Sequence, residues 1–123
     1  MRYTAKAIST AASVAAILGS LAFSIPATTL ADAAMIEAGK QIAFDRKKGN
    51  CLACHMIEGG SLPGNIGPPL VAMKDRFPDK AKLKAQITDS RVNNPNTIMP
   101  PFGPHEVLSK SEIDKVVEFI YSL

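Results

Sequence analysis

The feature that most constrains this chain is a five-residue motif, Cys-Leu-Ala-Cys-His, at residues 51–55. The spacing C-x-x-C-H is the attachment site for a c-type haem. Two thiols three positions apart on a helical turn can each add to one vinyl group of the porphyrin, and the next residue then lies under the ring with a nitrogen directed at the iron. The motif therefore predicts thioether bonds from Cys51 and Cys54 and an axial iron ligand from His55.

A C-x-x-C pair also occurs in thiol–disulfide oxidoreductases. That interpretation requires a strand before the pair and a surrounding sheet, and no clear strand pattern flanks residues 51–55. The motif uses the only two cysteines of the chain, so no structural disulfide is predicted. We therefore favour haem attachment over a thiol–disulfide pair.

The beginning of the chain is typical of a secretory signal peptide. A short basic head, residues 1–6, precedes a run over residues 7–23 that is rich in Ala, Val, Ile, Leu, Ser and Gly. Small residues after this run place cleavage near Ala31 or Ala33. Serines interrupt the run, and it is shorter than the ~20 strongly apolar residues of a membrane span. We expect export through the Sec pathway to the periplasm, where haem is attached in bacteria, with no membrane anchor after cleavage of residues 1–33.

Residues 34–123 predict one all-α domain of about four to five helices wrapped around one covalently bound haem. Apolar spacing and caps predict helices over residues 33–48, 70–76, 80–92 and 109–123. Asp79 is a candidate N-cap, and Ser109 with Glu112 forms a capping box. Glycine- and proline-rich stretches over residues 58–69 and 93–104 predict loops. A domain this small is marginally stable alone, and a bound haem adds an apolar body for the helices to pack on.

The sixth iron ligand decides what such a haem can do. A methionine gives a six-coordinate electron carrier, whereas an open site binds gases or peroxide. Met99 is the favoured ligand, because its proline-rich loop lies far enough beyond His55 for the chain to cross the ring. Met73 is interpreted as core filler on a short helix. His105 is an alternative ligand, and an open site is the third possibility.

The other nitrogen of His55 needs a partner that sets its tautomer and orientation. A backbone carbonyl of the loop at residues 67–70 is a suitable partner, since proline there restricts the backbone.

The motif at residues 51–55, Gly67-Pro68-x-Leu70, Met99 in its loop and a capped last helix together resemble a class I cytochrome c. The resemblance implies one haem c whose histidine donates to the carbonyl of Pro68. It also implies that the first and last helices cross at a glycine, here Gly39, against an aromatic residue, here Phe119. Position 43 is alanine, where many members have an aromatic residue.

A narrower resemblance rests on four blocks, residues 43–51, 64–69, 73–78 and 94–103. These blocks are similar to SoxX, the family of small cytochrome subunits of SoxAX complexes in periplasmic sulfur oxidation. The resemblance implies a heterodimer with a SoxA-like dihaem or monohaem cytochrome. Such a complex is an L-cysteine S-thiosulfotransferase, which oxidatively couples thiosulfate to a cysteine of the carrier protein SoxYZ. This chain would pass the electrons to a small soluble cytochrome c. The sulfur chemistry is expected on the partner, with no catalytic residue in this chain.

Two alternatives stay open, namely a freestanding monohaem electron carrier and a haem-based ligand sensor with an open sixth site. The formal net charge is +3. Its main basic residues are Arg46, Lys47, Lys48, Lys74, Arg76, Lys80, Lys82 and Lys84. They form either an ordinary solvated surface or a rim that docks an acidic partner. Nucleic acid is not an expected partner of an exported haem protein. Lys80 and Lys84 share a helix face and repel unless acidic residues answer them.

Overall fold

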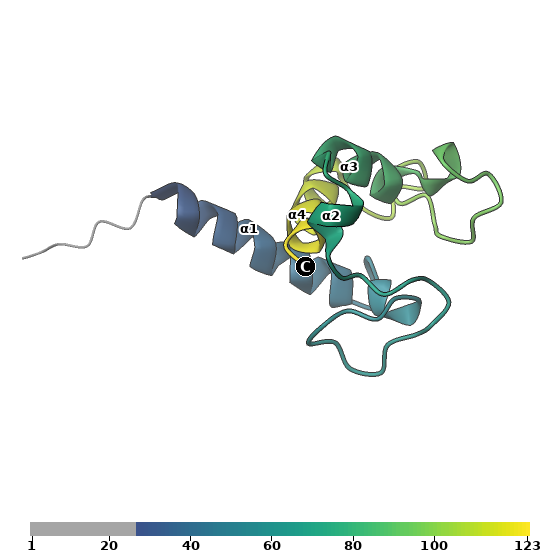
Figure 1. Ribbon diagram of the computed structural model, residues 1–123, viewed down its shortest axis with the longest axis horizontal. Coiled ribbons are helices and arrows are strands. Elements are labelled where there is room, and N and C mark those ends of the chain that lie inside the picture. The colour runs from purple at the N-terminus through teal and green to yellow at the C-terminus, as the bar shows by residue number, and fades with distance from the viewer. Residues whose placement is uncertain (1–26) are drawn as a thin grey trace, which may run out of the picture.

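Helix α1 (Ala27–Phe44) and helix α4 (Lys110–Tyr121) form the central crossed pair of the fold (Figure 1). The computed structural model describes residues 27–123, and this range contains no strand. Between the two helices lie the short 3-10 helix η1 (Cys51–Ala53), α2 (Met73–Arg76), α3 (Lys80–Thr88) and a second 3-10 helix, η2 (Ser90–Val92). The all-α prediction is confirmed, and the sheet that a thiol–disulfide fold requires is absent from the described residues.

Most of the predicted signal peptide, residues 1–26, lies outside the described residues. Helix α1 begins at Ala27, earlier than predicted, and its first turns extend away from the body of the molecule (Figure 1). Both candidate cleavage positions, Ala31 and Ala33, are exposed on this projecting part. Within residues 27–123 no helix has the length and apolarity needed to cross a membrane. Cleavage after one of these alanines stays a prediction.

Helices α1 and α4 meet at Gly39. A methyl group on its Cα would lie 1.9 Å from the backbone oxygen of Lys115 and 2.9 Å from Cβ of Phe119, so only glycine permits this approach. Ala43, one turn further on, is completely buried in the same interface. Phe44 packs edge-to-face on Phe119, with ring centroids 5.8 Å apart and an interplanar angle of 85°. The aromatic partner of Phe119 is therefore the residue after Ala43, and such a pair adds about 0.5–1.5 kcal/mol beyond its buried area.

Helix α1 ends at Phe44, and the predicted continuation to residue 48 is wrong. The carboxylate of Asp45 accepts a hydrogen bond from the backbone N–H of Lys47 at 2.8 Å. The backbone N–H of Gly49 returns to the oxygen of Ile42 at 3.1 Å. These bonds replace the regular helical pattern, as short acidic side chains near helix ends often do. The basic residues 46–48 therefore lie in a turn that leads into the cysteine motif and not in the helix.

The predicted helix over residues 80–92 is two helices. Asp89 is extended, with φ −150° and ψ 94°, and this ends α3 at Thr88. The side chain of Asp89 then accepts from the backbone N–H of Arg91 at 3.1 Å and caps η2. The cap predicted for the start of α3 is confirmed, because Asp79 accepts from the N–H of Ala81 at 2.9 Å.

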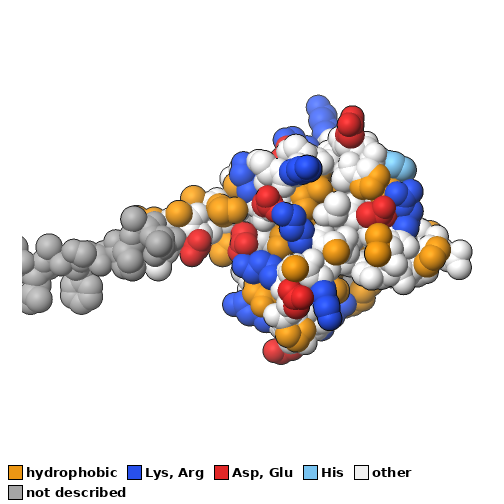
Figure 2. Space-filling model, turned by 90° about the horizontal axis from the view of Figure 1, so that it is seen from above, with side chains coloured by type: hydrophobic (Ala, Val, Ile, Leu, Met, Phe, Trp, Pro, Cys, Tyr) orange, Lys and Arg blue, Asp and Glu red, His pale blue; other side chains and the backbone are white. Residues whose placement is uncertain are grey.

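Acidic residues of α4 form ion pairs with two lysines of α3. Lys80 lies 2.8 Å from Glu118, and Lys84 pairs with Asp114. The like charges on one face of α3 are therefore each offset from the neighbouring helix, although exposed pairs of this kind contribute only about 0–1 kcal/mol each. Figure 2 shows acidic and basic side chains interspersed on the face that it displays. For these two lysines the solvated-surface interpretation fits better than a docking rim.

The crossing at Gly39 generates a stability prediction. We expect Gly39→Ala to lower the free energy of unfolding by about 1–3 kcal/mol, because the added methyl overpacks a backbone contact. Urea unfolding of the holoprotein measures the change. The control is Gln41→Ala on the exposed side of the same helix, which should alter the free energy by less than about 0.5 kcal/mol. Equal or greater stability for Gly39→Ala, which the helix propensity of alanine alone would give, contradicts the close approach.

Candidate haem-binding site

A cavity of about 570 Å³ separates the loop that carries the C-x-x-C-H motif from the loop that carries Met99. This volume lies within the range of about 300–1,000 Å³ that small-molecule and cofactor sites occupy. Cys51, Cys54 and His55 line one side, and Met99 lines another. Most of the remaining wall is apolar, and it includes Leu83, Ile87, Phe102, Val116 and Ile120. Every predicted thioether and axial position therefore faces the same apolar space.

The two cysteines are positioned by a single 3-10 turn. The backbone N–H groups of Cys54 and His55 both donate to the oxygen of Cys51, at 3.2 and 2.9 Å. Asn50 enters the turn in the left-handed region, with φ 47°, a conformation that asparagine tolerates better than most residues. Burial raises the pKa of the Cys51 thiol to about 11. Reactive redox cysteines have lowered pKa values, so this environment argues further against a thiol–disulfide pair.

The glycine-rich loop over residues 58–69 lies against the motif and bonds to it through the backbone. Gly64 N–H donates to the oxygen of Leu52 at 2.7 Å, and Gly67 N–H donates to the oxygen of Cys54 at 2.8 Å. A Cβ atom on Gly64 would lie 2.0 Å from the oxygen of Ala53. The glycines therefore allow a close backbone contact between this loop and the motif that side chains would block.

The imidazole of His55 is held by the next part of this loop. Its Nδ1 lies 2.7 Å from the carbonyl oxygen of Pro68, the contact that the family resemblance implied. A carbonyl only accepts, so Nδ1 carries the proton and Nε2 keeps its lone pair for a metal. A Cβ on Gly67 would lie 2.4 Å from the ring, which shows how closely the backbone packs on the imidazole. Arg76 of α2 donates to the oxygen of Pro69 at 2.8 Å and anchors the loop from behind.

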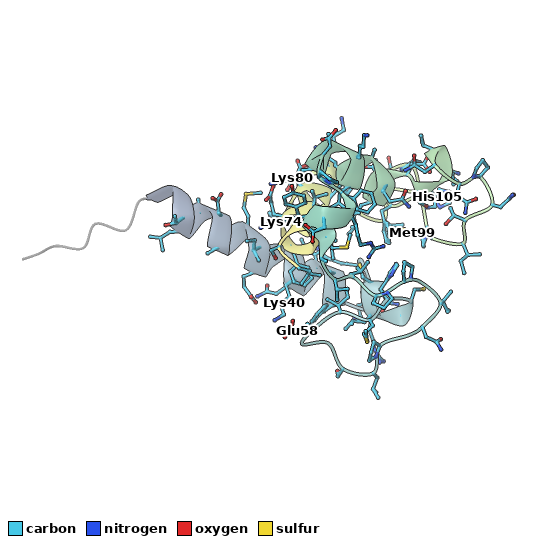
Figure 3. All side chains as sticks on the ribbon, in the orientation of Figure 1. Lys40, Glu58, Lys74, Lys80, Met99 and His105 are labelled. Atoms are coloured by element: carbon cyan, nitrogen blue, oxygen red, sulfur yellow. The ribbon has the colours of Figure 1, made fainter. Side chains whose placement is uncertain are left out.

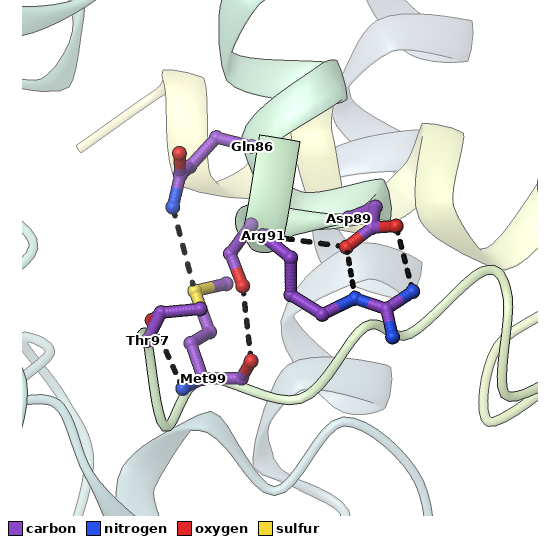
Figure 4. A network of polar contacts seen from close by, with 6 residues as sticks. Gln86, Asp89, Arg91, Thr97 and Met99 are labelled. Carbon is purple, nitrogen blue, oxygen red and sulfur yellow. Dashed lines mark hydrogen bonds and ion pairs between the residues drawn. The ribbon is translucent and has the colours of Figure 1, made fainter. Parts of the chain in front are cut away.

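The main chain of Met99 is held on both sides (Figure 4). The hydroxyl of Ser90, a completely buried residue, donates to the oxygen of Met99 at 2.9 Å. The N–H of Met99 donates to the hydroxyl oxygen of Thr97 at 3.2 Å. The side-chain amide of Gln86 lies 3.9 Å from the Met99 sulfur. The loop that carries the candidate ligand is thus fixed by hydrogen bonds as well as by its prolines.

The other candidate ligands are placed differently. Met73 is 2 % exposed and belongs to the hydrophobic core, as predicted, although it also contacts the cavity. Its sulfur already accepts from the guanidinium of Arg76 at 3.4 Å. His105 is exposed and does not line the cavity (Figure 3). Of these three residues, Met99 is the one whose side chain lies at the cavity outside the packed core.

The turn before the cysteine motif is tied to α4 by an ion pair between Lys48 and Glu112. Glu112 also accepts from the backbone N–H and the hydroxyl of Ser109, both at 2.9 Å, which confirms the predicted capping box. The Lys48 ammonium, followed by these Ser109 donors, lowers the pKa of Glu112 to about 2. One carboxylate therefore caps α4 and fixes the approach to the haem motif.

Sequence reasoning missed the side chains that hold Met99. Gln86, Ser90 and Thr97 are common polar residues in helix ends and loops, and no spacing rule marks them. Their roles follow only from the fold, which brings η2 beneath the Met99 loop. Ser90 lay inside the helix predicted over residues 80–92, so its position there gave no signal of a contact with Met99.

The family model described as cytochrome c oxidase, cbb3-type, subunit III matches residues 34–120. The chain belongs to this family of cytochrome c domains, and with its single C-x-x-C-H motif it is a monohaem cytochrome c. Among solved structures it is similar to SoxXA from P. pantotrophus, with a TM-score of 0.64 and 28 % sequence identity over 70 % of this chain and 79 % of that chain. The class I cytochrome c fold is thus confirmed, and the chain is a SoxX-like cytochrome.

A curated relative, described as an uncharacterized lipoprotein of Aquifex aeolicus (strain VF5), is 33 % identical over 76 residues. The match covers 61 % of this chain and 37 % of that relative, so the chain spans much less than the whole length of the relative.

The family implies a covalently bound haem c, and the residues present fit one. The fit rests on two thiols, an imidazole with Nε2 available and a thioether, all facing one apolar cavity.

The lowered pKa of Glu112 predicts that the holoprotein becomes less stable to unfolding as the pH falls into the acid range. A carboxylate with a folded pKa of about 2 contributes stability that is fully present above its unfolded pKa of about 4.5 and is lost as the pH falls towards 2. We expect Glu112→Gln to lower the melting temperature at pH 7, with the difference from wild type shrinking between pH 4.5 and 2. Thermal melts followed by circular dichroism measure it. Glu58→Gln, on an exposed loop, should melt like wild type throughout. A difference that does not change with pH would show that the carboxylate charge is not responsible.

Proposed function

We propose that this chain is the electron-transfer subunit of a SoxAX-type complex. The observation that supports electron transfer is the placement of His55 and Met99 at one apolar cavity that also holds both thiols. The similarity to SoxXA supports the particular complex. The finer assignments below rest on the family resemblance together with this geometry.

Each site residue has one role in the proposal. Cys51 and Cys54 would hold the haem through thioether bonds, while His55 and Met99 would ligate its iron. The haem supplies a one-electron couple whose potential a methionine ligand raises. The Pro68 carbonyl fixes the imidazole, and the apolar wall excludes water. A low-dielectric, rigid surrounding of this kind lets an electron enter and leave with little rearrangement.

The sulfur chemistry belongs to a SoxA-like partner, a dihaem or monohaem cytochrome. When thiosulfate is joined to the thiol of the SoxYZ carrier cysteine, a sulfur–sulfur bond forms, and one proton and two electrons are released. The SoxX-like chain accepts these electrons one at a time and passes them to a small soluble cytochrome c. Both of its own thiols are committed to the haem, so no group of this chain is assigned to catalysis. Its enzymatic role is that of a subunit.

The proposed place of this function is the periplasm. In this proposal residues 1–33 serve as the signal peptide. The remaining domain, residues 34–123, nearly coincides with the range 34–120 that the family model matches. Export would bring the cysteines to the compartment where haem is attached. The main alternative is a freestanding monohaem electron carrier, which the same ligand set at one apolar cavity would serve without a partner subunit. A ligand sensor is the second alternative, and it requires an open sixth site.

Methionine ligation separates the carriers from the sensor. We expect Met99→Leu to abolish the weak long-wavelength absorption band of a methionine-ligated ferric haem and to lower the midpoint potential, because the thioether favours ferrous iron. The ferrous variant should bind carbon monoxide readily. Met73→Leu is the matched control, since it replaces a core methionine of similar volume and should keep the band.

Two results would contradict this assignment. If ferrous wild-type protein binds carbon monoxide rapidly, the sixth site is open and the sensor interpretation leads. If Met73→Leu removes the band and Met99→Leu does not, the fold stands but the ligand is Met73.

Complex formation separates the Sox subunit from the freestanding carrier. We expect the purified holoprotein to form a stable heterodimer with the SoxA-like cytochrome of its own organism, measured by analytical ultracentrifugation. Addition of thiosulfate and SoxYZ should then reduce the haem of this chain only in the heterodimer. Met99→Leu should assemble equally well, which distinguishes assembly from electron transfer. Two results together would favour the freestanding carrier. The protein would stay monomeric and oxidised when thiosulfate, SoxYZ and the SoxA-like cytochrome are present, and the chemically reduced protein would pass its electron directly to an oxidase.

A further inference from the structure

Gln86 stands apart among the cavity residues because it carries an uncharged amide next to the Met99 sulfur. It lies on α3 and lines the same cavity as Met99. Its Nε2 is 3.9 Å from the sulfur, within the longer range of hydrogen bonds to sulfur, and the contact is drawn in Figure 4. Neither the haem motif nor the methionine ligand requires an amide at this place.

The orientation of this amide is determined by its other neighbour. Asn93 donates from Nδ2 to Oε1 of Gln86 at 2.7 Å. A thioether sulfur only accepts, so the nitrogen end of Gln86 must face Met99 and its oxygen end must face a donor. The reversed amide would place an oxygen lone pair against the sulfur lone pairs.

The fold brings Asn93 to this position through the break between α3 and η2. Asp89 is extended there and caps η2, and both oxygens of its carboxylate hold Arg91, at 2.8 and 2.9 Å. The chain therefore folds back after α3, and the residue after η2 returns to the side chain of Gln86. The same 3-10 helix carries Ser90, which holds the Met99 carbonyl. One short segment thus fixes both the backbone and the sulfur environment of this methionine.

We propose that Gln86, held by Asn93, is a positioning residue that donates a hydrogen bond to the Met99 sulfur and raises the midpoint potential of the haem. This inference rests on the proposed ligation by Met99. A thioether sulfur has two lone pairs, so one can bind iron while the other accepts from Gln86. The bond withdraws electron density from the sulfur and makes it a weaker donor to ferric iron. The positive end of the amide dipole, directed towards the site, acts in the same direction.

The test compares midpoint potentials of the holoprotein and its variants by spectroelectrochemistry. Gln86→Leu removes the donor, and we expect a downward shift of the midpoint potential together with a displaced long-wavelength band. Asn93→Ala keeps the amide but releases its orientation, and it should shift the potential in the same direction by a smaller amount. The matched control is Gln41→Leu, because Gln41 is an exposed glutamine of α1 whose amide bonds to Glu37, at 3.2 Å, far from the haem cavity.

A second variant keeps the test decisive if Gln86→Leu does not fold. Gln86→Ala removes the N–H without adding a charge or bulk beside the sulfur, and it too should lower the potential. A purely structural role would change the free energy of unfolding and leave the potential of the folded variants at the wild-type value. Potentials that match those of Gln41→Leu, or that rise, overturn the proposal.

The outcome also distinguishes this proposal from the proposed function. If wild-type protein lacks the methionine band, the ligation itself is wrong and both fall together. If the wild type has the band and loses it only in Met99→Leu, while Gln86→Leu has a wild-type potential, only the role of Gln86 is wrong.

Discussion

The close approach of α1 and α4 at Gly39 is the contact on which the rest of the structure depends. Because Gly39 has no side chain, the two helices can pack with their main chains almost touching. A single added methyl would collide with a backbone oxygen of α4. This contact fixes the direction in which α1 delivers the chain to the cysteine motif, and Phe44 on Phe119 then locks the rotation. The Lys48–Glu112 pair ties the following turn to the same helix. The position of the haem motif is therefore set by a helix crossing that lies outside the motif.

The two sides of the cavity are built on different physical principles. On the histidine side, a loop with many glycines is bonded to the motif through its own backbone, and a carbonyl fixes the imidazole. On the methionine side, hydroxyl and amide side chains from α3 and η2 hold the ligand loop. A backbone carbonyl offers one fixed geometry, whereas side chains can be exchanged one at a time. The methionine side is thus the part of the site where small substitutions can adjust electronic properties.

The motif and the helix caps were predictable because each is a local rule with a fixed spacing, and the glycine at the helix crossing was implied by the resemblance to class I cytochromes c. Asp79, Ser109 with Glu112 and the turn at residues 51–55 all behave as their sequence patterns indicate. The end of α1 and the break at Asp89 were missed because a carboxylate in competition with the helix leaves no mark in the apolar periodicity. Gln86 and Ser90 were missed for another reason. Their partner, Met99, follows them by 13 and 9 residues on an irregular loop whose path no spacing rule fixes, so their contacts exist only after the loop has folded back.

The backbone pairing between the glycine-rich loop and the motif has an evolutionary consequence. Since Gly64 and Gly67 bind the motif through main-chain N–H groups, the outward side chains of the same loop contribute little to holding the imidazole. Leu62, which is 88 % exposed and does not line the haem cavity, is free to vary without disturbing the tautomer of His55. A lineage can therefore change the surface that its cytochrome presents near the cavity while the iron environment stays constant. Recognition and redox chemistry, although carried by one loop, can diverge separately.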